Sequence, residues 1–188
     1  MNSEAEANLD AVLIGGRERR EIVLVDYDQE WPERFGRLAQ IIRHAVGSKA
    51  LLVEHIGSTA VPGLTAKPII DILLTIHDVA DEAGYVAPLE GAGFVLRVRE
   101  PGHRMLRTPS KDVHLHVFSS DSDAVPNYQD LRDWLRVDES DRALYADTKR
   151  MLAQRQWTDM NQYAEAKTVV IAQILARARM WRAKQPST

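Results

Sequence analysis

The chain has 188 residues, of which 45% are hydrophobic and 27% are charged, and its formal net charge is −3. This composition is ordinary for a globular domain with a sizeable core, and the mild acidity argues against binding nucleic acid through bulk charge. The chain has no cysteine, which excludes disulfides, a thiol nucleophile and cysteine-ligated metal sites. No apolar run approaches the roughly 20 residues of a membrane-spanning helix. The acidic N-terminus lacks the order of a secretion signal, so we expect a cytoplasmic protein without a membrane partner.

The first regular elements are predicted between residues 22 and 47. Residues 22–25 form a short β-type run. Apolar residues at 31–46 then recur at steps of three and four, which predicts one apolar face of a helix. Asp28 is a candidate cap for this helix, Pro32 is tolerated in its first turn, and Gly47 is expected to end it.

The middle of the chain alternates between short apolar runs and turn residues. Glu100-Pro101-Gly102 is a turn-type sequence that joins two of the runs. One helix is expected at 78–90. Strands are predicted at 51–53, 69–76, 94–98, 104–108 and 113–118.

After Pro126 the pattern becomes helical, with apolar residues spaced by three or four. It predicts helices around 131–135, around 143–152 and, as one long helix, at 163–181. The expected fold is therefore α/β (α+β), a mixed β-sheet with flanking helices and a C-terminal helical layer. The expected organisation is a flexible arm at 1–20, a single domain at 21–182 and a tail at 183–188. Within the domain, the sheet core lies at about 21–120 and the helical layer at about 126–182.

The most informative stretch is a Gly57-Ser58-Thr59 turn after a strand, followed by Asp71 inside the next apolar strand. A carboxylate among Ile and Leu is costly unless it is paired, binds a metal or faces a cleft. Glycine lets backbone N–H groups approach a phosphate, and the hydroxyl adds a donor. The alternative is a tight turn with a buried aspartate that accepts from backbone amides.

Lys67 lies four residues before Asp71 and is a candidate to neutralise a phosphate or to pair with that carboxylate, although a solvated lysine has the same pattern. His103-Arg104 at the start of a strand is a weaker indication of anion binding. His114 and His116 project from one face of a strand, which is common in metal sites.

With His55 and Asp71 nearby in the sheet, these two histidines suggest a site of mixed nitrogen and oxygen ligands. The alternative is a half-exposed strand face with two polar rings.

Two Tyr-x-x-x-Lys pairs lie at helical spacing, so each places its tyrosine and lysine on one helix face. Together they predict a cationic, aromatic wall for a nucleotide or phosphorylated ligand. The alternative is that the tyrosines pack and the lysines extend to solvent. Arg132 either pairs locally or points into the cleft. The pairs are Tyr145 with Lys149 and Tyr163 with Lys167.

Taken together, these motifs resemble the GrpB family of the nucleotidyltransferase superfamily, in the same order over about residues 22–182. The specific part runs from Glu54-His55-Ile56-Gly57-Ser58-Thr59 through Val61-Pro62-Gly63-Leu64 to Lys67-Pro68-Ile69-Ile70-Asp71. It is preceded by Tyr27-x-x-x-Trp31-Pro32-x-x-Phe35 and followed by His114-Leu115-His116-Val117, Leu131-Arg132-Asp133-x-Leu135 and the two Tyr-x-x-x-Lys pairs.

The resemblance implies a nucleotidyltransferase-like core. Members also occur fused to dephospho-CoA kinase, and the transferase label of the family is largely inherited from the superfamily.

One departure concerns the metal ligands. Nucleotidyltransferases typically place two carboxylates on the strand after Gly-Ser, where they hold two magnesium ions. Here Asp71 occupies the first position and Leu73 the second, and a later strand offers His114 and His116. One acid and two imidazoles favour a softer or single divalent metal, among Mg, Mn or Zn.

The leading hypothesis is a nucleotidyltransferase-like enzyme that transfers a nucleotidyl or phosphoryl group to a small molecule. A degenerate member that binds a nucleotide or phosphorylated metabolite without turnover is the alternative, and a His/Asp metal-dependent hydrolase or ligase is the third. A homo-oligomer is left open. Asp71 and His116 are the candidate catalytic residues, and the candidate metal ligands are Asp71, His114, His116 and His55. The candidate substrate-binding residues are Gly57, Ser58, Thr59, Lys67, Arg104, Arg132, Tyr145, Lys149, Tyr163 and Lys167.

Overall fold

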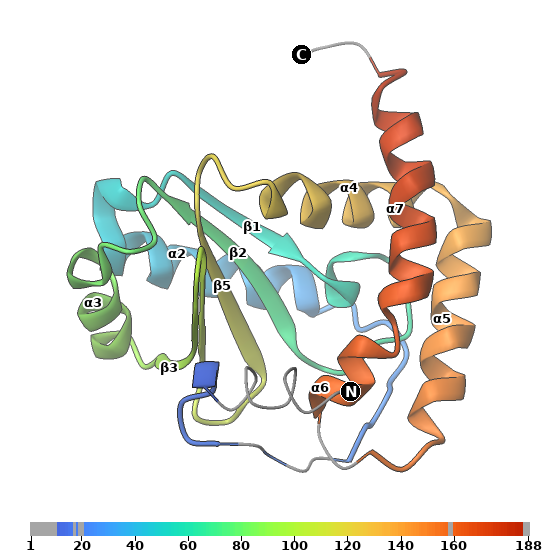
Figure 1. Cartoon of the computed structure of the whole chain (residues 1–188), viewed down its shortest axis with the longest axis horizontal. Helices are drawn as coiled ribbons and strands as arrows, with labels where there is room; N and C mark the ends of the chain where they lie inside the picture. The colour runs from blue at the N-terminus through green and yellow to red at the C-terminus, as the bar shows by residue number, and fades with distance from the viewer. Residues whose placement is uncertain (1–10, 17, 19–20, 158–159, 186–188) are drawn as a thin grey trace.

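Five strands form one mixed sheet in the order β1-β2-β5-β4-β3 (Figure 1). The computed structural model describes residues 11–16, 18, 21–157 and 160–185. Strands β2 and β5 run parallel, and every other neighbouring pair is antiparallel. This arrangement confirms the predicted α/β fold with a mixed sheet. The strands are β1 (Leu52–Ile56), β2 (Ile70–Ile76), β3 (Val95–Glu100), β4 (His103–Arg107) and β5 (Val113–Ser119).

The register between β2 and β5 sets the two faces of the sheet. Asp71 is opposite His114, and Leu73 is opposite His116. Because side chains alternate along a strand, these four residues share one face, and Ile72 points to the other. The predicted strand pattern at 69–76 and 113–118 is thus confirmed, with each strand bounded within one residue of the prediction.

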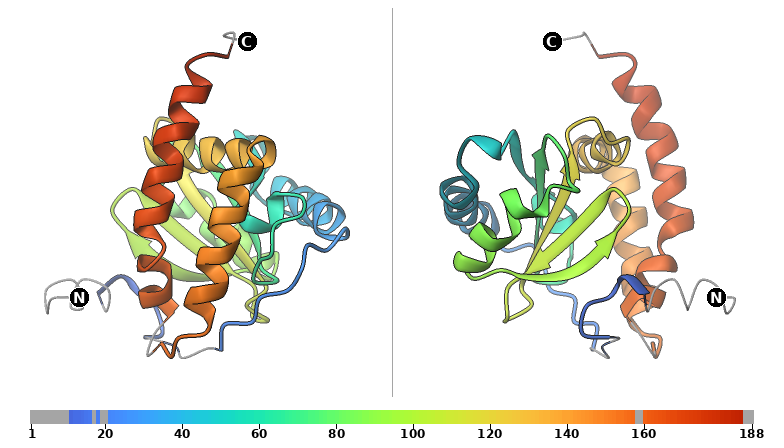
Figure 2. Two further views of the ribbon diagram at one scale, coloured as in Figure 1. Left: turned by 90° about the vertical axis from the view of Figure 1, so that its right-hand side faces the viewer. Right: turned by 60° about the vertical axis from the view of Figure 1, so that its left-hand side comes forward.

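One face of the sheet is covered by α2 (Trp31–Val46) and α3 (Val86–Gly91), as Figure 2 shows. The helix predicted at 31–46 has these same bounds, and Ile42 on its inner face is fully buried. The backbone N–H of Glu30 bonds the Asp28 carboxylate at 2.9 Å, just before the helix begins. The apolar core on this face includes Ile42, Val46, Val53, Ile70, Ile72, Leu74, Leu89, Leu106, Leu115 and Val117.

The other face carries the C-terminal helices, which confirms the predicted helical layer (Figure 2). Asp141 links three of these helices, because it accepts from Trp134 Nε1 at 2.6 Å and from the Arg177 guanidinium at 2.6 and 2.7 Å. No helix in the described part of the chain is long and apolar enough to cross a membrane. The helices are α4 (Ala124–Val137), α5 (Glu139–Ala153), α6 (Met160–Glu165) and α7 (Thr168–Arg182).

Two predicted helices differ from the structure. Instead of one helix at 78–90, the chain forms the short 3-10 turn η3 (Glu82–Gly84) and then α3. Buried Tyr85 donates its hydroxyl to the Val79 carbonyl at 2.8 Å, and this contact folds the preceding turn back on itself. The long helix predicted at 163–181 is divided into α6 and α7, because Lys167 N–H bonds the Ala164 carbonyl and tightens the chain there.

Short connections complete the domain. The 3-10 turn η1 (Gly47–Lys49) follows α2, and η2 (Ser58–Ala60) follows β1. The β-type run at 22–25 forms only an isolated bridge, in which Val25 and Ala66 exchange backbone hydrogen bonds of 2.9 and 3.0 Å.

Residues 11–16 of the N-terminal segment lie against the sheet edge, whereas most of the arm expected at 1–20 lies outside the described residues. Leu13 forms a bridge with Val98, and Ile14 N–H bonds the Arg97 carbonyl at 2.9 Å. The buried Arg97 guanidinium donates in turn to the carbonyls of Ile14 and Gly16.

Candidate functional site

A cleft of about 440 Å³ opens between the sheet and the helical layer. The sheet side presents Gly57, Ser58, Asp71, Met105, Arg107, His114 and His116. The helical side presents Tyr128, Leu131, Arg132, Tyr145, Lys149, Tyr163 and Lys167. Most of the residues predicted from the sequence therefore line one cleft.

Gly57 begins the turn that leads from β1 into the cleft. Its backbone has φ 69° and ψ −170°, a conformation that is essentially restricted to glycine. A Cβ at this position would lie 2.5 Å from Asp71 Oδ2. The close approach of this turn to β2 therefore depends on the missing side chain, and it places Ser58 beside Asp71.

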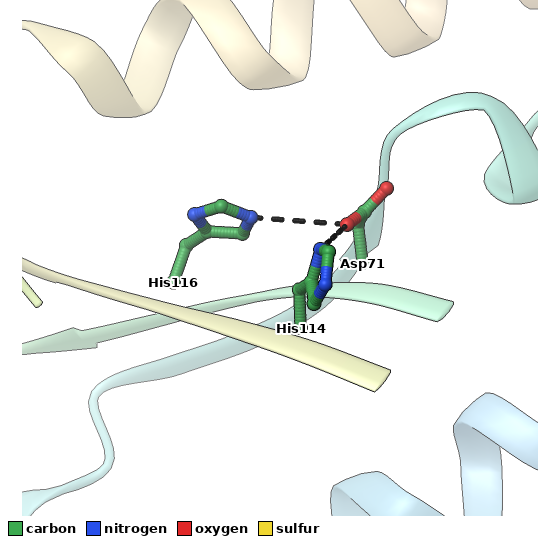
Figure 3. A group of neighbouring side chains, drawn as sticks. All are labelled: Asp71, His114 and His116. Carbon is green, nitrogen blue, oxygen red and sulfur yellow. Dashed lines mark ion pairs between the residues drawn. The ribbon is translucent and has the colours of Figure 1, made fainter. Parts of the chain in front are cut away.

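Asp71, His114 and His116 form a cluster on the cleft face of β2 and β5 (Figure 3). Asp71 Oδ1 lies 3.3 Å from His114 Nδ1 and 3.8 Å from His116 Nε2. One potential ligand atom from each residue lies within 4.8 Å of the others. Burial raises the pKa of the Asp71 carboxyl, but the two imidazoles outweigh it and hold this pKa well below its usual range. Asp71 is therefore a carboxylate that faces two nitrogen donors.

Two further residues continue the cluster away from the cleft. His116 Nδ1 lies 3.1 Å from His103 Nε2, and His103 Nδ1 lies 2.5 Å from Glu100 Oε1. Burial and the neighbouring His116 ring lower the pKa of His103. The sequence reading linked His103 to anion binding, whereas the structure connects it to His116 and Glu100.

His55 does not join this cluster. It is opposite Ile72 in the β1–β2 register, so it points to the α2 side of the sheet, where Phe35 stacks on its ring at 4.9 Å. Its Nε2 lies 3.0 Å from Thr59 Oγ1, and that hydroxyl donates to the Ile69 carbonyl at 3.0 Å. Burial lowers the pKa of His55 to about 4. The structure thus contradicts His55 as a metal ligand, and the Thr59 hydroxyl is already bonded within the turn.

Lys149 lies opposite the cluster on α5. Its Nζ donates to Ser58 Oγ at 3.0 Å and to the Thr65 carbonyl, and it lies 4.7 Å from the Tyr145 ring centroid. Burial lowers the pKa of Lys149 to about 7, and the nearby cations Lys167 and Arg150 act in the same direction. An anionic ligand beside this buried ammonium would favour its charged form, and that attraction would add to the affinity for the ligand.

The second Tyr-x-x-x-Lys pair completes the cationic wall. The Tyr163 ring has Lys167 Nζ 4.8 Å from its centroid and Lys67 Nζ 5.3 Å from it. Burial lowers the pKa of Lys167, and the attraction of Asp71 opposes that shift. The buried Tyr163 hydroxyl has no hydrogen-bond partner among the described residues. Both pairs thus contribute to the cleft, as the sequence predicted.

The arginines divide between the two faces. Arg104 is opposite Val117 on the core side, where it donates to Glu82 at 2.6 Å, so its predicted role in the cleft is wrong. Arg107, which the sequence reading missed, faces the cleft and binds the Glu18 carboxylate at 2.7 and 3.0 Å.

Arg132 lines the cleft on α4, but its guanidinium is engaged with its neighbours. It donates to Glu54 at 2.6 Å, to Asp133 at 2.7 Å and to the His55 carbonyl at 3.2 Å. Arg132 thus joins α4 to β1 at the edge of the cleft.

Comparison of the sequence with known proteins identifies close relatives. The family described as GrpB protein matches residues 21–177. A UPF0157 protein of Streptomyces coelicolor is 51% identical over 166 residues, which cover 88% of this chain and 89% of the relative. A UPF0157 protein of Halalkalibacterium halodurans is 50% identical over 160 residues, which cover 84% and 82%. A dephospho-CoA kinase of Mycolicibacterium paratuberculosis is 30% identical over 195 residues, which cover 87% of this chain and 47% of the kinase.

Comparison of the fold points in the same direction. The crystal structure of the conserved protein GrpB from Enterococcus faecalis has a TM-score of 0.75 and 28% identity, covering 85% of this chain and 99% of that one. Cid1 poly(U) polymerase with MgGTP bound has a TM-score of 0.51 and 11% identity, covering 70% of this chain and 45% of that one. The second likeness concerns the fold alone.

Proposed function

The chain belongs to the GrpB family, and we propose that it is a nucleotidyltransferase-like enzyme that transfers a nucleotidyl or phosphoryl group to a small molecule. One observation carries the proposal: a carboxylate beside two imidazoles lines the same cleft as two lysines, the buried Lys149 and the half-buried Lys167. Phosphoryl transfer needs mainly positioning and stabilisation of charge, and such a cleft can provide both.

The cationic wall would hold the phosphates. Lys149 is buried and Lys167 is half-buried, and desolvation penalises the charged forms of both. A phosphate that approached these ammonium groups would restore the charged state and gain charge-assisted hydrogen bonds. Ser58, which already accepts from Lys149, would add a hydroxyl donor beside the Gly57 turn. The likeness in fold to Cid1 with MgGTP bound supports a nucleoside triphosphate as the donor.

The cluster of Asp71, His114 and His116 fits a divalent metal ion, among Mg, Mn and Zn. The three side chains offer one oxygen and two nitrogen atoms within 4.8 Å of one another. When bound, such an ion would supply positive charge for the transferring group. Leu73, at the position of a second carboxylate, is fully buried beneath α4 with Ile56 and Phe118. The cluster therefore differs from a paired magnesium site.

The remaining residues would orient the acceptor. His116 lies at the sheet side of the cleft next to the Tyr128 ring, at 5.7 Å between centroids. As a ligand of the ion it would not also be free to act as a base, so the charge of the ion would activate the acceptor hydroxyl. The apolar side chains of Leu131 and Ile171 line the same cleft and would exclude water from it.

A second reading is a binding protein that holds a nucleotide or phosphorylated metabolite without turnover. Leu73 favours it, since Asp71 is the one carboxylate that the described residues contribute to the cluster. The two readings differ in their dependence on metal. The enzyme requires the cluster, whereas the binding protein requires chiefly the lysines.

The test is a thermal-unfolding panel with ATP, GTP, CTP and UTP, each with Mg²⁺, Mn²⁺, Zn²⁺ or EDTA. A ligand present at about 1,000 times its Kd stabilises the native state by about 4 kcal/mol, which is easily measured. We expect a metal-dependent stabilisation by a nucleotide that is lost in Asp71→Asn. The matched control is Asp147→Asn, whose carboxylate is exposed on α5 and pairs with Arg150.

A stabilisation that survives EDTA and Asp71→Asn would favour the binding protein. Absence of stabilisation by all four nucleotides would overturn a nucleotide as the donor.

A further inference from the structure

The hydrogen bonds behind His116 determine which of its nitrogen atoms is free. Glu100 is a carboxylate and accepts, so His103 donates from Nδ1. His103 Nε2 is then the acceptor of a neutral ring, and His116 donates to it from Nδ1. In this arrangement His116 Nε2 carries a lone pair, and it faces Asp71 Oδ1 at 3.8 Å.

The geometry of the two rings supports this hydrogen bond. Their planes differ by 11°, and their centroids are 5.3 Å apart. The centroid distance exceeds the 3.1 Å between the nitrogen atoms by about two ring radii. The rings therefore meet edge to edge, as a hydrogen bond in the ring plane requires. Phe118 stacks on His103 at 4.5 Å and holds the ring in place.

The three side chains of the cluster make no short hydrogen bond with one another. The contacts of Asp71 Oδ1 with the two imidazole nitrogens, at 3.3 and 3.8 Å, are longer than a good hydrogen bond. Two atoms bound to one tetrahedral ion at about 2.0–2.1 Å lie roughly 3.3 Å apart. The two spacings that involve Asp71 are thus close to those of ligands around a shared ion, and the three ligand atoms, which lie within 4.8 Å of one another, would need to move closer together to complete the site.

We propose that Asp71 Oδ1, His114 Nδ1 and His116 Nε2 bind one transition-metal ion of the zinc class, and that His103 and Glu100 are its positioning residues. This inference rests on the metal ion of the proposed function but not on nucleotide binding or turnover. Imidazole ligands favour zinc or cobalt over magnesium and manganese, which prefer oxygen ligands. The Glu100–His103 pair fixes the ring and tautomer of His116, as carboxylate–histidine partners do in metal sites.

The experiment measures metal binding to the whole chain without nucleotide. Co²⁺ is added as a spectroscopic probe, and Zn²⁺ affinity is measured by competition with a chelating dye. We expect one ion per chain, with the absorption of tetrahedral or five-coordinate Co²⁺, and loss of binding in His114→Ala. A wild-type chain that binds neither ion stoichiometrically would overturn the site.

The positioning role is tested with two substitutions of His103. His103→Phe keeps a ring on Phe118 but removes the nitrogen acceptor, so Zn²⁺ affinity should fall about 10- to 100-fold. His103→Gln provides an amide oxygen that can accept from His116 Nδ1, and it should recover most of that loss. The control is Arg99→Gln on the same hairpin, where Arg99 pairs with Glu82 on the other face.

The outcomes separate a positioning role from a general loss of structure. Thermal unfolding in EDTA should be similar for all these variants, while the Co²⁺ spectrum changes only in the His103 series. If His103→Phe does not fold, Glu100→Ala on the partly exposed hairpin end provides the same test, with an expected loss of several-fold. Wild-type Zn²⁺ affinity in the folded variant used would overturn the positioning role. Zinc binding together with failure of every nucleotide would overturn the proposed donor and leave this site intact.

Discussion

The same strands form both faces of the sheet, but one face is an apolar core and the other is a polar cleft. On the α2 side, Ile72 and Leu115 are fully buried in an apolar core. On the cleft side, the neighbouring residues Asp71 and His114 are partly exposed and face each other at 3.3 Å. Because side chains alternate along a strand, a residue of the apolar core and a residue of the cleft can be neighbours in sequence.

The two faces also differ in how their side chains contribute to the free energy of unfolding. The apolar side chains of the core face, such as Ile72 and Leu115, are stabilised by burial. The cleft face keeps the Asp71 carboxylate, the buried Lys149 and a Tyr163 hydroxyl without a hydrogen-bond partner in the described part of the chain, at a cost in desolvation. Substitutions on the first face should therefore change the free energy of unfolding, and those on the second should change binding. The predictions below test that separation.

The largest effect is expected on the core face. Leu115→Ala leaves a cavity among residues that are fully buried, so the free energy of unfolding should fall by about 2–5 kcal/mol. His114→Gln, one residue away, should change it by less than about 1 kcal/mol. Urea denaturation followed by circular dichroism measures both. Similar losses for the two variants would contradict the separation of the faces.

The next effect is expected at Gly57, which contributes both to the stability of the turn and to the shape of the cleft. Gly57→Ala forces a side chain into a backbone conformation that costs about 1–3 kcal/mol and places Cβ against Asp71. We therefore expect both lower stability and weaker metal or nucleotide binding. Gly63→Ala is the control, because it shares a positive φ of 77° but has no atom within 4 Å of the added Cβ. Equal affinity of the two variants for metal and nucleotide would show that the site does not depend on Gly57.

The sequence was sufficient for elements whose pattern is local. The apolar period of 31–46 predicted α2, and alternation predicted that His114 and His116 share a face, because both patterns follow from geometry within one segment. The motif of 55–71 likewise placed Gly57, Ser58 and Asp71 in one cleft.

Features that depend on pairing between distant segments were not predictable. Arg104 and Arg107 lie on one strand, and only the register of β4 against β5 decides that Arg107 faces the cleft. The same register brings His103 to His116. His55 was assigned to the wrong face, because the sequence alone does not show how β1 pairs with β2.

A smaller effect concerns the pH dependence of stability. The folded-state pKa of Lys149 is about 7, below its ordinary value of 10.5, so the unfolded state binds more protons between these values. The free energy of unfolding should therefore rise with pH from about 7 to 10, with a slope of at most one proton from this residue. Lys149→Met should flatten that rise and weaken nucleotide binding, whereas Lys184→Met, at an exposed position after the end of α7, should do neither. Urea denaturation at several pH values checks this, and an unchanged slope in Lys149→Met would contradict it.

The smallest effect is expected at the mouth of the cleft, where Glu18 binds Arg107 and Lys111. The Arg107 guanidinium holds the pKa of Glu18 at about 2, below its ordinary value of 4.5. The pair therefore stabilises the fold above pH 4.5, and this contribution is lost as the pH falls through 2. Because the groups are partly exposed, Glu18→Gln should lower the free energy of unfolding at pH 7 by only about 0.2–1 kcal/mol.

The same substitution should affect binding in the opposite direction. Glu18→Gln removes a negative charge from beside Arg107, which lines the cleft, so affinity for inorganic pyrophosphate should increase, and more so at low salt. Isothermal titration at two salt concentrations measures it, with Glu33→Gln on α2 as the exposed carboxylate control. A variant that loses stability without gaining pyrophosphate affinity would assign the Glu18 pair to the structural side of the comparison. A gain in affinity with little loss of stability would assign it to the cleft.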